Sequence, residues 1–405
     1  MTSHQPTGLV VPAPAAGAET ESPSALVQDR VDQLLASIDP VTTSPSEFRG
    51  RQFDLGLAWV QFPEGRGGMD QSPGLQAYVD SRLRAAGAKP PGIRNFFGLT
   101  MAAQTLVTHG SEELKDLLLR RTFTGEATWC QLFSEPGAGS DLANIQALAV
   151  RDGDDWIVNG QKVWNTLAHV ADWGMLIARY DRALSKHKGM TYFVLDMHAA
   201  GVDVRPLIQM TGEAEFNEMF LDDVRVPDSR RVGDVGEGWT VAMTTLMNER
   251  SSIGASSSRP ARGSGAIAEA VRIWREEAAR RDPVSRDDLM RLWCEAEVLR
   301  LTNIRARENR KAGNPGPEGS IVKLMFAELN QRIYQLCVDL LGAAGTVGYT
   351  YEMSRVEPLG LVGPRGTARR MFLRSRANSI EGGTSEIQRN IIGERILGLP
   401  REPRP

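Results

Sequence analysis

The stretch from Trp129 to Asp141, WCQLFSEPGAGSD, contains the residues of this chain best suited to approach a ligand closely. Its apolar start is typical of a strand, and its Pro, Gly and Ser residues predict a turn with exposed backbone N–H groups. Ser134 and Ser140 add hydroxyl groups, while Gly137 and Gly139 let the backbone pass close to a flat or anionic ligand. A tight surface turn without a ligand would have the same composition.

Glu249 is a carboxylate with apolar residues close to it in the sequence. It lies in a predicted helix, Trp239 to Ser252, next to apolar Leu246, Met247 and Ile253. These neighbours indicate that this helix face is partly buried, and burial raises the pKa of a carboxylate toward the range of a general base. A solvated or ion-paired helix carboxylate is the alternative interpretation.

The composition of the 405-residue chain predicts a globular protein of two or three domains. The net charge of −3 argues against nucleic acid or an anionic membrane as the main partner. No apolar run approaches the ~20 residues that a membrane span needs. Three separated cysteines, Cys130, Cys294 and Cys337, indicate no disulfide framework, and five unclustered histidines indicate no metal site.

The periodicity of apolar residues divides the chain into four parts. Residues 1–25 are rich in Pro, Ala, Ser and Thr without the basic start of a signal peptide, so we expect a disordered arm and a cytoplasmic protein. Helical spacing dominates 26–128, and short β-rich runs fill 129–235. From 236 to 405 the spacing is helical again. The predicted fold class is therefore α+β, with a middle antiparallel β-domain and a C-terminal helical bundle.

Individual elements follow from the same spacing. The expected helices cover 24–36, 75–86, 101–107, 111–121, 239–252, 266–280, 289–310, 321–341 and 385–397. The expected strands cover 147–150, 156–158, 161–164, 175–179, 190–197, 202–207 and 218–226. Between the second and third of these strands, Asn159-Gly160 predicts a hairpin turn. No Gly-x-Gly-x-x-Gly occurs, which disfavours a Rossmann nucleotide domain.

Four stretches resemble the acyl-CoA dehydrogenase family in residues, order and spacing. They are WCQLFSEPGAGSDLA at 129–143, NGQKVWNTLAHVADW at 159–173, TTLMNERSSIG at 244–254 and EGGTSEIQRNIIGERILGLP at 381–400. The resemblance implies FAD as cofactor and an acyl-CoA thioester as substrate. It also implies that a carboxylate removes the α-proton while the β-hydrogen leaves as hydride to flavin N5. Electrons would then pass to an electron-transfer flavoprotein.

The family motifs imply which residues contact the flavin. The strand that begins at Trp129 should meet the pyrimidine side of the flavin through its backbone, and Ser140 should lie near the flavin phosphates and the pantetheine arm. Trp164 and Thr166 match a family pair in which an aromatic residue packs on the flavin and a hydroxyl follows. A turn cap at Ser140 and a strand core aromatic at Trp164 are the alternatives. The residues implied in this way are Gln131, Leu132, Phe133, Ser134, Gly139, Ser140, Trp164 and Thr166.

The general base has two alternative positions in the family. One is a Glu immediately before Gly-Thr-Ser, where this chain has Gly382, so that Glu381 lies one residue too early. The other is a Glu directly before an Arg on an earlier helix, which matches Glu249 and Arg250. The resemblance therefore favours Glu249, as in the isovaleryl and long-chain type, with Glu381 as the alternative. Arg250 would hold the CoA moiety or the helix packing, and the Gly382 N–H would donate to the thioester oxygen.

Residues for the ADP part of FAD match the family less closely. Thr384 and Glu386 occupy family positions that reach this part, often across a subunit interface. Asp339 and Gly342 fall where the family carries a Gln and Gly-Gly for the same purpose. An aspartate beside a pyrophosphate is a departure because like charges repel; a solvated helix residue is the alternative interpretation of Asp339.

A second departure lies between Ala266 and Leu292, where many relatives have Arg-x-x-Phe-Gly. This chain has WREEAARRDPVSRDD, with Arg280 or Arg281 as candidate substitutes. We expect a homodimer or homotetramer, and a hetero-oligomer is also open. Three other functions stay open as well: an oxygen-activating flavoprotein of the same fold, acting as an oxidase or hydroxylase, a non-catalytic partner subunit, and a small-molecule binding protein without flavin.

Overall fold

The structure is a computed structural model that describes residues 24–90, 95–253, 261–277, 281–311, 318–347, 353 and 368–401, with backbone only at 250–253 and 310–311. Of the predicted disordered arm, residues 1–23 lie outside the described residues. Its last two residues are not disordered, because Ser24 caps and Ala25 begins the first helix.

The chain first forms a group of helices. These are α1 (Ala25–Ser37), α2 (Pro45–Asp54), α3 (Gln76–Ala85), a π-helical turn η3 (Gly98–Ala102), α4 (Ala103–His109) and α5 (Glu112–Thr124). Ser111, the first residue of the predicted helix 111–121, is the N-cap of α5, since its hydroxyl accepts the N–H of Leu114 at 3.2 Å. Helix α2 was not predicted, because it is short, carries Gly50 in its interior and has little apolar periodicity.

An eight-stranded sheet follows in the order β6-β7-β3-β2-β4-β5-β8, with β1 beside β4. The strands are β1 (Trp129–Leu132), β2 (Leu148–Asp152), β3 (Asp155–Lys162), β4 (Trp173–Arg179), β5 (Met190–Asp196), β6 (Val202–Leu207), β7 (Phe216–Pro227) and β8 (Arg231–Val232). The expectation of a purely antiparallel domain is wrong in two places: β1 pairs with β4 in parallel, and β2 touches β4 through one parallel pair.

The parallel start of β1 and β4 has a visible cause. The Asp172 carboxylate accepts the N–H of Thr128 at 2.8 Å and its hydroxyl at 2.7 Å. The Thr128 carbonyl in turn accepts the N–H groups of Asp172 and Trp173. This four-bond junction ties the residues before the two strands together, so that both strands leave it in the same direction.

The predicted hairpin at Asn159-Gly160 is wrong. Both residues lie within β3, whose hairpin with β2 turns at Gly153 and Asp154 instead. A β-bulge shifts the pairing with β7 at this point, and a Cβ on Gly160 would come within 2.7 Å of Ala147. The glycine therefore permits β3 to approach Ala147, the residue before β2, closely. In the sequence, a glycine with this role cannot be distinguished from a glycine in a turn.

The C-terminal part is again helical. It contains α6 (Gly238–Ile253), α7 (Ala266–Glu276), α8 (Pro283–Lys311), α9 (Glu318–Leu341), α10 (Ala368–Ser375) and α11 (Ser385–Arg395). Helix α7 ends at Glu276, earlier than the predicted residue 280, and α10 was not predicted because it is one short, arginine-rich segment. Gly342 directly after α9 has φ 58°, a left-handed conformation that is typical of a glycine at a helix end.

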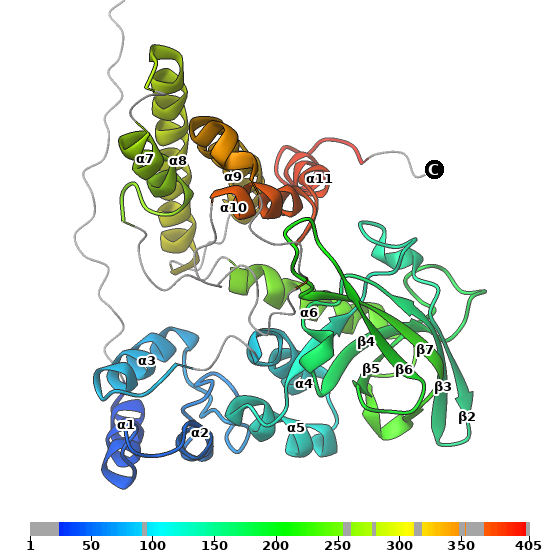
Figure 1. Cartoon of the computed structure of the whole chain (residues 1–405). Coiled ribbons are helices and arrows are strands. Elements are labelled where there is room, and N and C mark those ends of the chain that lie inside the picture. The colour runs from blue at the N-terminus through cyan, green and yellow to red at the C-terminus, as the bar shows by residue number, and fades with distance from the viewer. Residues whose placement is uncertain are drawn as a thin grey trace, which may run out of the picture.

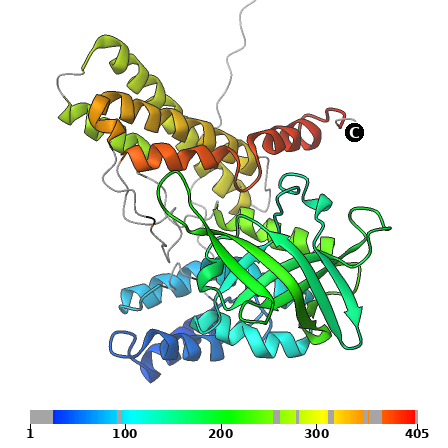
Figure 2. The same cartoon turned by 45° about the vertical axis from the view of Figure 1, so that its right-hand side comes forward.

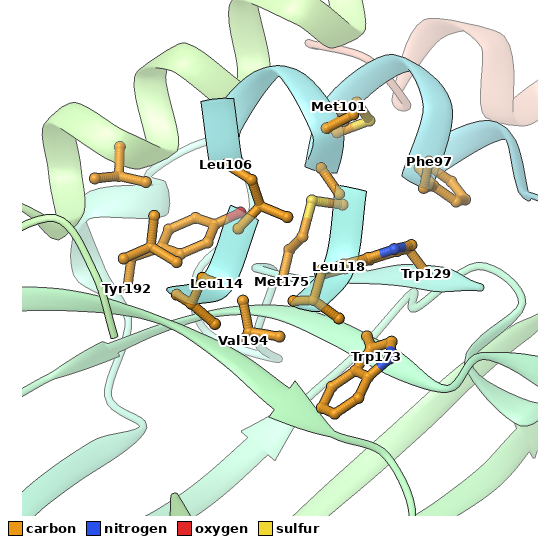
Figure 3. Packing of buried hydrophobic residues seen from close by; sticks show 14 of the residues in the cluster. Phe97, Met101, Leu106, Leu114, Leu118, Trp129, Trp173, Met175, Tyr192 and Val194 are labelled. Carbon is orange, nitrogen blue, oxygen red and sulfur yellow. The ribbon is translucent and has the colours of Figure 1, made fainter. Parts of the chain in front are cut away.

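Strands β4 and β5 of the sheet are buried on both faces. Met175 and Ile177 of β4 pack toward α4 and α5, while Leu176 between them packs into a second apolar cluster on the other face. Figure 3 shows the first cluster, in which side chains of helices and strands interleave. This burial explains why β4 and β5 read as continuous apolar runs rather than alternating ones.

Figures 1 and 2 show the three groups around one helix. Helices α1 to α5 lie below, the sheet lies to one side, and α7 to α11 form the bundle above. Helix α6 lies between them and contacts β4, β5, η3 and α4. The α+β order of helices, sheet and helices is therefore confirmed, and the domain limits 26–128, 129–235 and 236–405 stay predictions.

Leu118→Ala should lower the free energy of unfolding by about 2–5 kcal/mol, because the Leu118 side chain of α5 is fully buried in the cluster that α5 forms with the sheet. The adjacent Leu117 is 36% exposed on the same helix, so Leu117→Ala is a matched control that should cost less than about 1 kcal/mol. Urea unfolding of both variants measures the difference. Equal losses for the two variants would contradict the described packing of α5.

Candidate active site

The turn after β1 is closed by its own backbone and open on its outer side. Glu135 and Ala138 exchange two backbone hydrogen bonds, of 3.1 and 3.0 Å. A Cβ built on Gly137 or Gly139 would meet nothing within 4 Å, and Ser140 is exposed. The outer side of the turn therefore borders open space.

The side chains at the end of β1 and directly after it are buried or half-buried. Leu132 and Phe133 are buried, and the Phe133 ring packs edge-to-face on Tyr192 with centroids 5.9 Å apart. Gln131 and Ser134 are half-buried. This arrangement is compatible with the predicted role of the strand, which needs peptide groups rather than side chains.

A buried ion pair lies beneath the turn. Lys162, the last residue of β3, is fully buried, and its ammonium group donates to Glu135 Oε1 at 2.8 Å and to the Phe133 carbonyl at 3.1 Å. Glu135 also accepts the N–H groups of Gln146 and Ala147. Burial lowers the pKa of Lys162, and the adjacent Glu135 carboxylate opposes that lowering.

The loop after β3 presents Trp164 to solvent. Trp164 has φ 63° and is 59% exposed, an unusual state for a large aromatic residue. The next residue, Asn165, is buried and donates its amide to the Gln131 carbonyl at 2.9 Å. Asn165 also exchanges backbone hydrogen bonds with Asn217. The loop that carries Trp164 and half-buried Thr166 is thus fixed against β1.

Helix α6 carries Glu249 and is held by hydroxyl groups. The Thr245 hydroxyl lies 2.9 Å from that of Thr105 and 3.2 Å from that of Tyr192, all of them buried. One turn after Thr105 on α4, His109 places its Nε2 atom 2.8 Å from the hydroxyl of Thr244, the neighbour of Thr245 on α6. Glu249 itself is half-buried, as predicted for this helix face. The side chain of Arg250 lies outside the described residues.

Glu381 is already engaged by two donors. Arg374 donates to both of its carboxylate oxygens, at 2.9 and 3.2 Å, and Asn378 donates to one of them at 3.0 Å. After it, Gly382 has φ 62°, a conformation that favours glycine. Thr384 caps α11 by accepting the N–H of Ile387 at 3.2 Å.

Arg374 joins the loop of Glu381 to the sheet. It is 4% exposed and its Nε lies 3.5 Å from Oε1 of buried Glu215, which precedes β7. Its guanidinium also lies 5.9 Å from the ring centroid of Phe216, and that ring lies edge-to-face with Trp164 at 5.8 Å. The structure therefore brings the Trp164 loop and the Glu381 loop together through two shared neighbours.

Asp339 and Gly342 lie elsewhere in this chain. Helix α9 meets the Glu381 region at Asn330, whose amide donates to Asn378 at 2.8 Å. Asp339 is nine residues further along α9, or about 14 Å along the helix axis. It is exposed and accepts a hydrogen bond from Gln335 at 3.0 Å, as a solvated helix residue would. Their predicted role toward FAD stays a prediction.

The remaining candidates lie at the surface or outside the described residues. Glu386, in the first turn of α11, is exposed and lies 3.7 Å from Arg389. Arg280 is outside the described residues, and Arg281 donates to the Trp274 carbonyl at 2.8 Å. Among the described residues, no group of three His, Cys, Asp or Glu side chains could hold a metal, and no helix is long and apolar enough to cross a membrane.

Sequence reasoning missed the residues that hold the site in place. Lys162 and Asn165 lie within stretches already singled out, and a lysine at the end of an apolar strand was the one available signal of a buried charge. Arg374 and Glu215 gave no signal, because pairing over more than 150 residues cannot be read from spacing.

Comparison with known proteins finds one family over most of the chain. Two family profiles match: "Acyl-CoA dehydrogenase, middle domain" over residues 130–224 and "Acyl-CoA dehydrogenase, C-terminal domain" over 236–397. Acyl-CoA dehydrogenase IpdE1 of Mycobacterium tuberculosis is 36% identical over 350 residues, which is 86% of this chain and 86% of that protein.

Solved structures give the same fold. The ChsE4-ChsE5 complex of Mycobacterium tuberculosis matches with a TM-score of 0.66 at 30% identity, over 93% of this chain and 94% of that chain. The Tcur3481-Tcur3483 steroid ACAD matches with a TM-score of 0.69 at 24% identity, over 95% of this chain and 100% of that chain.

Replacing Arg374 by Met should destabilise the protein by about 3–5 kcal/mol, because Glu215 and Glu381 would lose their buried cation. Arg389→Met is the matched control, since the Arg389–Glu328 pair is exposed and should be worth less than about 1 kcal/mol. Chemical denaturation measures both variants. A small loss for Arg374→Met would mean that its two carboxylates do not depend on it.

His109 should make stability depend on pH. Desolvation lowers the pKa of His109 against the opposing charge of Glu237, so the native state favours the neutral ring. The stabilisation is present above the unfolded pKa of about 6.5 and is lost as pH falls through the folded pKa. His109→Gln can keep the bond to Thr244 but does not titrate. Urea unfolding between about pH 7.5 and 5 should show the wild type losing more stability than this variant; parallel curves would contradict the assignment.

Proposed function

Because the chain belongs to the acyl-CoA dehydrogenase family of FAD-dependent oxidoreductases that act on CH–CH bonds, we propose that it desaturates the α,β-bond of an acyl-CoA thioester with Glu249 as general base. The chain is an acyl-CoA dehydrogenase; the assignment of its base, its cofactor contacts and its electron acceptor is the proposal.

The place of Glu249 directly before Arg250 on α6 carries its choice as base, and the hydrogen bonds of Glu381 count against the alternative. A base must be able to turn a carboxylate oxygen toward the proton it removes. Both oxygens of Glu381 accept from Arg374, and one also accepts from Asn378, so the carboxylate is fixed as part of a structural cluster. Glu249 lies half-buried on α6, between the sheet and the bundle, where a carboxylate can be shielded from water (Figure 1).

The chain also offers donors to the thioester oxygen. Removal of the α-proton leaves negative charge on that oxygen, and a fixed N–H group stabilises the charge without reorganising. The Gly382 N–H belongs to a loop that is fixed at both ends. Arg374 donates to Glu381 before it, and Thr384 caps α11 after it. We assign this N–H to the thioester oxygen and Arg250 to the CoA moiety.

The residues around the β1 turn fit an isoalloxazine ring. The turn borders open space at Gly137 and Gly139, Trp164 offers an exposed aromatic face, and both stand on a fixed frame. We propose that the backbone of Gln131 to Ser134 and the side chains of Trp164 and Thr166 hold the ring. When bound, FAD supplies the hydride acceptor, and we propose an electron-transfer flavoprotein as the next acceptor.

The ADP part of FAD would need further residues. We propose Ser140 and Gly139 for the phosphates, and Asp339, Gly342, Thr384 and Glu386 for the ADP part across a subunit interface. The separation of Asp339 from the Glu381 loop within one chain supports contact across an interface rather than within the subunit. The related ChsE4-ChsE5 structure is a complex of two different chains, so a hetero-oligomer is the alternative to a homodimer or homotetramer.

Glu249→Gln should slow reduction of the bound flavin by an acyl-CoA about 10²–10⁴-fold, because it removes the general base. Glu381→Gln is the matched control, and it should reduce stability while leaving the reduction rate within about tenfold of the wild type. Anaerobic stopped-flow absorbance with a panel of acyl-CoA thioesters measures both rates.

Two results would overturn the proposal. If an acyl-CoA reduced the flavin of Glu249→Gln at the wild-type rate but did not reduce that of Glu381→Gln, the base would be Glu381. If the purified protein were colourless and bound FAD only with a second chain, the partner-subunit interpretation would replace an independent flavoenzyme. Fast reoxidation of the bleached protein by air would favour an oxidase over transfer to an electron-transfer flavoprotein.

A further inference from the structure

The buried ion pair under the β1 turn is built around one peptide group. The ammonium group of Lys162 donates to the Phe133 carbonyl at 3.1 Å as well as to Glu135 at 2.8 Å. Glu135 is fixed in turn by the N–H groups of Gln146 and Ala147. Lys162 therefore cannot shift without losing both of its bonds to the segment 133–135, and Glu135 is itself held by a second segment, 146–147.

The position of this carbonyl decides where the next N–H points. A trans peptide directs its C=O and N–H to opposite sides, and no cis peptide occurs among the described residues. Since the Phe133 carbonyl is turned inward to Lys162, the N–H of Ser134 is directed away from it. The following peptide is held as well: the Ser134 carbonyl accepts from Val163 at 2.9 Å, and the Glu135 N–H donates to Ala138.

We propose that Lys162 is a positioning residue that fixes and polarises the Phe133–Ser134 peptide, so that the Ser134 N–H donates to the pyrimidine side of the flavin and raises its reduction potential. The proposal rests on the flavin site proposed above. A cation on the carbonyl strengthens the N–H of the same peptide as a donor. Reduction places negative charge on the pyrimidine side, so a fixed donor there binds the reduced ring more tightly than the oxidised ring.

The alternative is that the pair only supports the fold. Buried ion pairs are weak sources of stability, because well-packed apolar residues can often replace them at no cost. The sheet contains another buried cation whose bonds support only the fold. Arg179 on β4 donates to the carbonyls of Ala143 and Ile145, which follow the turn in the sequence. Arg179 thus offers a control that is equally buried and bound to backbone but does not touch the Phe133–Ser134 peptide.

The test compares potentials of the purified flavoprotein, with its partner chain if one is required. The main variant is Lys162→Met with Glu135→Gln, which leaves no unpaired buried charge. We expect its ratio of affinities for reduced and oxidised FAD to fall about tenfold, which is a shift of about −30 mV for a two-electron couple. Dye-equilibrated anaerobic titration measures the potential. Arg179→Met should lower the unfolding temperature without changing the potential.

A second variant keeps the test open if the double variant does not fold. Glu135→Gln alone removes the anchor of Lys162 and should lower the same ratio about threefold, or roughly 14 mV. A wild-type potential in every variant that folds, with reduced thermal stability alone, would overturn the proposal and leave a structural ion pair. A wild type that binds no flavin would instead contradict the proposed function, so the two failures are distinguishable.

Discussion

The buried guanidinium of Arg374 is the constraint on which the relation between sheet and bundle depends. A charge with 4% exposure needs partners of opposite charge, and those of Arg374 come from two parts of the chain: Glu215 before β7 and Glu381 after α10. One turn earlier on α10, Arg370 forms a second pair with Glu213, at 2.6 Å. Both pairs require helix α10 to contact the loop that carries Glu213 and Glu215 before β7. They therefore fix the position of the Glu381 loop relative to the sheet.

Buried cations recur wherever the candidate site needs a fixed backbone. Lys162 binds the turn after β1, Arg179 binds the segment that follows that turn, and Arg374 binds the loop of Glu381. Lys162 and Arg179 bind backbone carbonyl groups in stretches that have no regular pairing of their own, whereas Arg374 binds the carboxylate of Glu381. The frame of the site is therefore electrostatic, while the apolar clusters fix the helices and strands around it.

The sequence was informative where the physics is local. Helical periodicity located most helices, and the Ser111 cap lies three residues before its donor. Glu249 is half-buried as expected, but its neighbour Met247 is 62% exposed, so the apolar neighbours alone do not account for that burial. Sequence reasoning failed where two distant segments meet. Gly160 serves a close approach to Ala147 rather than a turn, β1 pairs in parallel because of Thr128 and Asp172, and the partners of Arg374 lie far apart in sequence.

The nested pairing of the sheet also bears on the order in which it can fold. The β2–β3 hairpin forms by closing a turn of two residues. Pairing of β1 with β4 instead closes a much longer loop, which contains β2 and β3. Closing a long loop costs entropy that grows with the length left disordered, so a preformed hairpin shortens the effective loop between β1 and β4. Strand β1, which lies in the candidate site, would then be added late, after the hairpin beside it has nucleated.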